Sequence, residues 1–140
     1  MTYRTSPWVR AGLWAALLSG VPSTAIALSR GEDVLASTEV VGAVLVPDPR
    51  RGWLRVAVGG VVHLLISLFW ARVLQGALRG ITGSGRALTA GATSGAGIAV
   101  LDLGLVARLL PPIRALDGAP LVADHIAFGA IVGWILRRHH

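Results

Sequence analysis

The chain has 140 residues, of which 54% are hydrophobic and only 14% are charged. Ordinary globular proteins carry about 25% charged residues, so this composition excludes a typical soluble domain. The net charge of +6 comes from 13 basic residues, all of them arginine. Because these arginines stand at the ends of apolar runs and form no basic stripe, nucleic-acid binding is not expected. The absence of cysteine excludes disulfides and thiolate metal sites.

The first apolar run, residues 11–28, follows two arginines. It is longer than the apolar part of a signal peptide, and no clean small-x-small cleavage site follows it. We therefore expect an uncleaved membrane helix at about 8–28. Pro22 should kink this helix, because proline removes a backbone donor and clashes with the preceding turn. The hydroxyls of Ser23 and Thr24 can satisfy the carbonyl that the proline leaves free.

Three further apolar stretches have about the length needed to cross a bilayer, at residues 53–78, 89–110 and 121–136. The segment 32–46 is also apolar but too short to span. Because its apolar residues share no clean face, it is expected either to lie at the interface or to re-enter the membrane. The fold class predicted is an all-α bundle of four transmembrane helices, as a single domain, with a partly helical first extracytoplasmic loop.

Four crossings place both termini on one side of the membrane. With the termini inside, seven arginines face inward and six outward, so the positive-inside rule favours cytoplasmic termini by one residue. The richness in alanine, glycine, valine and arginine is typical of GC-rich bacterial genomes. The expected location is therefore the bacterial cytoplasmic membrane, with the lipid bilayer as the main partner.

Small residues recur every three or four positions on each expected helix, and such spacing marks the faces along which membrane helices pack. The stripes are Gly12, Ala16 and Gly20; Gly59 and Gly60; Gly91, Gly95 and Ala99; and Gly129 and Gly133. Each stripe continues onto polar residues. Residues three or four apart share a helix face, so these polar residues should point toward the other helices.

These polar residues also lie at a similar depth, roughly six to ten residues from one membrane surface, or about 9–15 Å. The candidate binding or proton-relay residues are Ser23, Thr24, His63, Asp102, Asp124 and His125. A lone carboxylate there costs at least about 2.5–3.5 kcal/mol, so Asp102 should meet His63, His125 or an arginine, or be protonated. The group could be a functional site or a hydrogen-bond network that fixes helix register. The sequence spacing indicates no metal site and no cofactor.

The patterns SGVPST, VVHLLISLFW and VADHIAFGAIVGWILRR resemble those of small four-helix integral membrane proteins from GC-rich bacteria, a group without an established activity. The resemblance covers most of the chain. It implies a location in the membrane and carries over no catalytic residue.

Two functions are consistent with these patterns. The first is a non-enzymatic membrane protein that assembles with itself, as a homo-oligomer, or with another membrane protein along its small-residue stripes. The alternative is a small transporter or proton- or ion-conducting protein that uses the histidines and aspartates. An enzyme is not expected, since no G-x-S-x-G or H-E-x-x-H motif is present.

Overall fold

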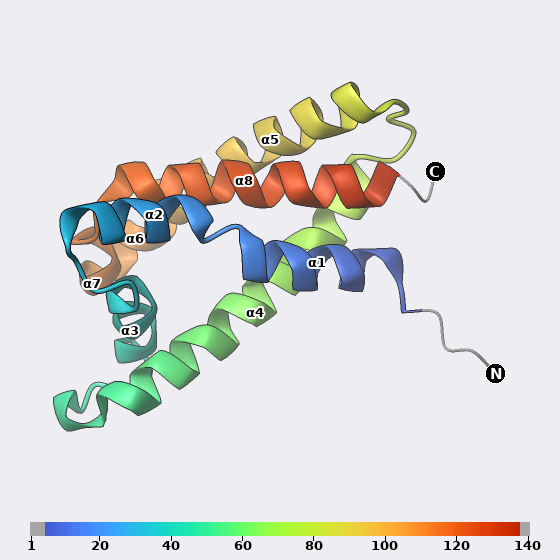
Figure 1. Ribbon diagram of the computed structural model, residues 1–140. Coiled ribbons are helices and arrows are strands. Elements are labelled where there is room, and N and C mark those ends of the chain that lie inside the picture. The colour runs from blue at the N-terminus through green and yellow to red at the C-terminus, as the bar shows by residue number, and fades with distance from the viewer. Residues whose placement is uncertain (1–4, 138–140) are drawn as a thin grey trace.

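The computed structural model describes residues 5–137. Within this range all regular secondary structure is helical. Four helical stretches are long and apolar enough to cross a membrane: Pro7–Arg30, Pro49–Ala77, Ser84–Leu109 and Gly118–Leu136. The all-α class and the four span-length helices predicted from the sequence are therefore confirmed (Figure 1).

The first of these stretches is two helices, α1 (Pro7–Leu18) and α2 (Val21–Arg30). We expected one helix with a kink at Pro22, and this expectation was wrong in detail. The chain leaves the helical path at Ser19 and Gly20, so Pro22 lies in the first turn of α2. A proline is tolerated there because its missing N–H would have no intrahelical acceptor. α2 ends at Gly31, whose φ of 68° favours glycine.

The loop after α2 carries the short helix α3 (Ala36–Ala43) and the 3-10 turn η1 (Pro49–Arg51), which leads into α4 (Gly52–Ala77). The helix in the expected 32–46 segment is thus shorter than that segment, since it covers only Ala36–Ala43. α3 packs directly on the first half of α4. A Cβ placed on Gly42 would overlap the carbonyl of Arg55, and one on Gly59 would overlap the carbonyl of Thr38.

The third stretch begins at α5 (Ser84–Leu101), five residues before the expected start at Thr89. The glycine-rich turn is shorter than predicted, because the helix begins directly after Gly83. The φ of Gly83 is 91°, a left-handed value that favours glycine. After α5 the chain adopts a π-helical turn, η2 (Asp102–Val106), and then α6 (Ala107–Leu109).

Leu110 is extended ahead of two prolines, which disfavour helical geometry in the residue before them. A four-residue turn, α7 (Pro111–Arg114), leads to α8 (Gly118–Leu136), which begins three residues before the expected 121. The earlier start follows from Asp117, whose carboxylate accepts the backbone N–H of Ala119 at 3.1 Å and caps the helix.

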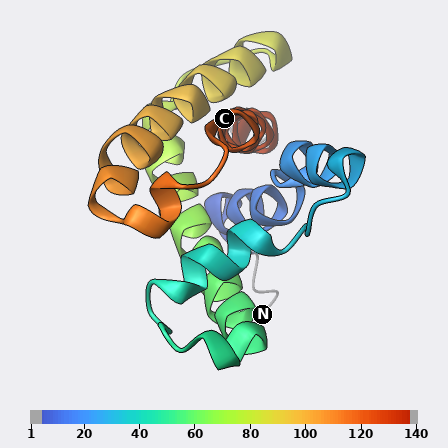
Figure 2. The ribbon, with the colours of Figure 1, turned by 90° about the vertical axis from the view of Figure 1, so that its left-hand side faces the viewer.

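α8 is the central helix, with α5 on one side of it and α1 and α2 on the other (Figure 2). It also contacts α4. α1 begins and α8 ends at the end of the molecule where α4 is followed by α5 (Figure 1). α3 and α7 lie at the opposite end.

The most extensive helix contact is the α5–α8 seam, which contains Gly91 and Gly95 of α5 and Gly129 and Gly133 of α8. A Cβ on Gly91 would overlap the carbonyl of Gly129, and the reverse substitution would do the same. Both small-residue stripes therefore pack backbone against backbone within one molecule, in the way that small residues allow in membrane proteins.

Candidate functional site

A partly open cavity of about 670 Å³ lies among the helices, with walls from α1, α2, α3, α4, α5, η2, α7 and α8. Most of its wall residues are apolar. All six residues singled out from the sequence line it: Ser23, Thr24, His63, Asp102, Asp124 and His125. The structure therefore brings all six residues to the wall of one cavity.

The six residues do not form one hydrogen-bonded cluster. They divide into separate contacts, of which the most direct joins His125 of α8 to Asp102 of η2. The Nε2 atom of His125 lies 3.2 Å from Oδ2 of Asp102, and the two side chains are 23% and 27% exposed. Of the partners proposed for Asp102, the structure selects His125 rather than His63 or an arginine.

The contact made by the second ring nitrogen of His125 shows how many protons the Asp102–His125 pair holds. Nδ1 lies 2.7 Å from the backbone carbonyl of Leu121. A carbonyl only accepts, so Nδ1 must carry a hydrogen and donate it. The contact between Nε2 and the Asp102 carboxyl then needs one further proton, held by either partner. The pair, with one shared proton, carries no net charge in either arrangement.

Asp124, next to His125 on α8, contacts the broken first stretch instead. Its Oδ1 accepts the backbone N–H of Ser23 at 2.9 Å. Ser23 is in the first turn of α2, where N–H groups lack intrahelical acceptors. A carboxylate at a helix N-terminus is also favoured by the helix dipole. Asp124 therefore caps α2 from a neighbouring helix.

His63 of α4 contacts the other side of the same break. Its Nε2 lies 3.1 Å from the carbonyl of Ala16, in the last turn of α1. Since that carbonyl only accepts, His63 donates. The two helix ends at the Ser19–Gly20 break are thus satisfied by titratable side chains, a histidine at the carbonyl end and a carboxylate at the amide end.

The two serine and threonine candidates behave differently from each other. The Oγ of Ser23 donates to the carbonyl of Gly20 at 3.2 Å. That carbonyl also accepts the N–H of Thr24, so Ser23 does not satisfy a carbonyl left free by Pro22, contrary to the expectation from the sequence. Thr24 lines the cavity and is exposed.

Sequence reasoning missed two features of the site. Ser37 and Thr38 of α3 add hydroxyls to the cavity wall. Both residues belong to the short apolar segment 32–46, which the sequence already singled out. That this segment lies over the cavity depends on its glycine contacts with α4, which the sequence does not reveal. The second missed feature is the π-helical turn that begins at Asp102. Such turns occur frequently at functional sites, and no residue pattern in this stretch predicted one.

Arg55 holds α3 and its loop against α4, a role that no residue pattern predicted. Its guanidinium donates to the carbonyl of Val46 at 2.9 Å and to that of Pro47 at 2.6 Å. It also lies 3.5 Å from the carboxylate of Glu39 on α3, and its side chain is only 15% exposed. One arginine thereby fixes the segment that covers one side of the cavity.

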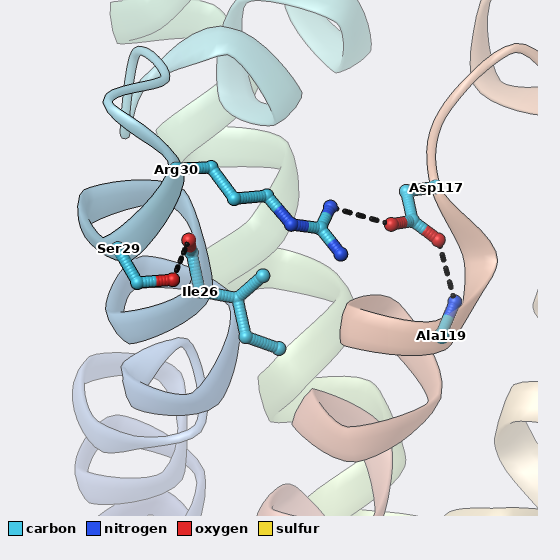
Figure 3. Close-up of polar contacts among 5 residues, drawn as sticks. All are labelled: Ile26, Ser29, Arg30, Asp117 and Ala119. Carbon is cyan, nitrogen blue, oxygen red and sulfur yellow. Dashed lines mark hydrogen bonds and ion pairs between the residues drawn. The ribbon is translucent and has the colours of Figure 1, made fainter.

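A second fastening lies outside the cavity, where α2 ends and α8 begins. Arg30 donates to Asp117 at 2.9 Å (Figure 3). The hydrogen bond from Arg30, together with the N–H of Ala119, lowers the pKa of the Asp117 carboxyl below its usual value. The pair is about half exposed, so it joins the two helix ends with little stabilisation.

Within residues 5–137, no three histidine, aspartate or glutamate side chains are grouped so that they could hold a metal ion. The site therefore consists of the Asp102–His125 pair, the break between α1 and α2, and the cavity beside them. No family model, no curated protein and no solved structure matches this chain. The resemblance to small four-helix bacterial membrane proteins therefore stays an expectation, and the function has to be inferred from the site itself.

Proposed function

We propose that the chain is a multi-pass protein of the bacterial cytoplasmic membrane that acts as a small proton-linked transporter. In this proposal the cavity binds a small molecule, and the Asp102–His125 pair gains or loses its shared proton as that molecule binds. The observation that carries the proposal is the pair itself. It is a one-proton site in the wall of a cavity of about 670 Å³, and ligand pockets commonly measure about 300–1,000 Å³.

The break between α1 and α2 supports the same proposal. Interrupted membrane helices whose free ends face a binding site are a recurring feature of transporters. Here the break lies beside the cavity, and His63 and Asp124 satisfy its two ends. The contacts that close the break are therefore made by groups that can change charge.

Proton movement tests the proposal in proteoliposomes loaded with a pH-sensitive dye. After a pH step, with valinomycin and potassium clamping the membrane potential, wild-type vesicles should equilibrate faster than protein-free vesicles. Asp102→Asn should abolish this excess flux while the helical content persists, because an amide cannot exchange the shared proton. Asp117→Asn is the matched control and should behave as wild type. Equal flux in wild type and Asp102→Asn, or no excess flux in wild type, would refute proton linkage.

Assembly with itself or with a membrane partner is a second candidate function. The α5–α8 seam uses its glycines inside one molecule, so those stripes no longer favour assembly. Gly60, Gly76 and Gly97 favour it instead. At all three an added Cβ would meet nothing within 4 Å. Gly76 lies in the last turn of α4, whereas Gly60 and Gly97 are interior helix positions, where glycine costs about 1 kcal/mol relative to alanine.

The mass of the purified protein in mild detergent tests assembly. Wild type should form a defined oligomer that Gly97→Leu dissociates without loss of helical content. A monomeric wild type, or an oligomer unaffected by substitutions at Gly60, Gly76 and Gly97, would contradict this second function.

A further inference from the structure

We infer that the ligand of the cavity is an organic cation with an apolar body, taken up in exchange for the proton shared by Asp102 and His125. This inference rests on the proposed function and names its substrate class. It is carried by the charge inventory of the cavity wall, by its aromatic lining, and by the contacts that the two carboxylates make there.

The charged and titratable groups of the wall can be named helix by helix. α1, α2 and α3 contribute hydroxyls and apolar groups only, α4 contributes His63, η2 contributes Asp102, and α8 contributes Asp124 and His125. No arginine of residues 5–137 lines the cavity, although arginines make up all of the chain's basic side chains. With the Asp102–His125 pair neutral, the cavity wall carries one further carboxylate, Asp124, and no arginine, and this balance favours a positively charged ligand over an anion.

One carboxylate has an oxygen left for such a ligand. Asp124 uses Oδ1 to cap α2, and its other oxygen accepts no hydrogen bond from residues 5–137. The carboxylate is held in place by the backbone N–H of Ser23. A cation in the cavity could therefore pair with Asp124 without breaking the contact that closes the helix break.

Aromatic rings supply the complementary apolar surface. Phe69 and Trp70 of α4 and Phe128 of α8 all line the cavity. Phe69 and Trp70 meet edge to face, with ring centroids 5.2 Å apart. Aromatic faces attract cations, and more strongly where water is excluded. These rings and the aliphatic wall around them suit a cation whose charge is carried on an apolar body.

The exchange balances in charge. Before binding, the Asp102–His125 pair holds one shared proton and is neutral. When a monovalent cation enters, that proton leaves to water, so that a neutral imidazole and an ionised Asp102 remain. Nδ1 of His125 keeps its hydrogen on the Leu121 carbonyl throughout. One positive charge enters as one leaves, so the net charge of the cavity does not change.

Two ions of the same shape and opposite charge test the inference on the full chain in lipid nanodiscs. Tetraphenylphosphonium and tetraphenylborate are each measured separately by equilibrium dialysis, with empty nanodiscs to subtract partitioning into lipid. Wild type should bind the phosphonium at a saturable site at least about tenfold more tightly than the borate. A dye in weakly buffered solution should register about one proton released per phosphonium bound, because the pair holds one shared proton.

Variants locate the binding. Asp102→Asn should eliminate proton release, and Asp124→Asn should weaken phosphonium binding about tenfold, because each removes a charged partner. Asp48→Asn, at an exposed carboxylate beside η1, is the control and should change neither quantity. If Asp124→Asn fails to fold, the wild-type comparison of the two ions still decides the inference.

The inference is overturned if the borate binds as well as the phosphonium, or if neither binds. It is also overturned if Asp102→Asn releases protons as wild type does. Its failure is distinguishable from failure of the proposed function. Proton flux that depends on Asp102, without preference for the phosphonium, would retain the transporter and reject the cationic substrate. Phosphonium binding without proton flux in the proteoliposome assay would retain the cationic ligand and reject the transporter.

Discussion

The two sides of α8 differ in how they pack. On one side, α8 meets α5 along a seam of four glycines in which backbone touches backbone. On the other side, α8 meets α1 and α2 beside the cavity, and there Asp124 caps the broken helix. Small residues in a membrane helix are thus not interchangeable signals, since one set closes a seam and another lies beside an open space.

This difference in packing indicates that one part of the molecule is rigid and that another part can move. A seam of glycines has no side chains to rearrange, so α5 and α8 are expected to behave as one rigid unit. The cavity side depends instead on two hydrogen bonds, made by His63 and Asp124 to the backbone of the broken helix. Motion linked to ligand binding is therefore expected between this α5–α8 unit and the helices α1, α2 and α4.

The seam should be the part most sensitive to added volume. Gly91→Val places a side chain where the carbonyl of Gly129 lies, and we expect a loss of about 3 kcal/mol or more in the free energy of unfolding. Gly97→Val, on the same helix with open space beyond its Cα, is the matched control. Denaturation in mixed micelles, followed by circular dichroism, measures both. Equal stability of the two variants would show that the seam is not tightly closed.

Substitutions at the helix break should lower the free energy of unfolding less than those in the seam. The size of the loss should depend on whether the new side chain can donate a hydrogen bond. His63→Leu removes the donor to the Ala16 carbonyl, and the expected loss is about 1 kcal/mol. His63→Gln keeps a donor at a similar position and should recover most of it. The same unfolding assay compares the two. A glutamine variant no more stable than the leucine variant would mean that the contact does not close the break.

The Arg30–Asp117 pair should give the smallest effect and a specific pH dependence. Because the pKa of Asp117 is lowered by Arg30, the stabilisation is present above the usual carboxyl pKa. It is lost as the pH falls through the lowered value. Asp117→Asn should therefore be slightly less stable than wild type at neutral pH, and the two should converge in strong acid. Thermal unfolding across this range tests the point, and a gap that widens in acid would contradict it.

Much of the fold follows from the sequence, because a helix able to cross a bilayer needs a certain length and composition. The four span-length helices could be predicted on this ground, and the regular spacing of glycines indicated packing faces without showing that α5 pairs with α8. The break at Ser19 and Gly20 could not be located, because Pro22 is compatible both with a kink and with the first turn of a new helix. The start of α5 was placed late for a similar reason, since several glycines could each have ended the turn.

The six candidate residues named from the sequence all line the cavity, but the contacts between them could not be predicted. Shared faces and depth brought together the six candidate residues. Which carboxylate meets which histidine depends on helix rotation, and on the π-helical turn that begins at Asp102. Periodicity with a fixed repeat cannot anticipate that turn. The hydroxyls of Ser37 and Thr38 depend on how α3 docks, which is decided by Gly42, Gly59 and Arg55 rather than by the pattern within α3.

The proton shared by Asp102 and His125 can be observed directly by ¹⁵N NMR of the histidine ring. A variant carrying His63→Gln, His139→Gln and His140→Gln keeps His125 as its single histidine, so its two ring nitrogens give unambiguous signals. The account predicts that Nδ1 stays protonated at every pH, that Nε2 titrates, and that Asp102→Asn changes the pH at which it does so. A titrating Nδ1, or an Nε2 titration unaffected by Asp102→Asn, would contradict it.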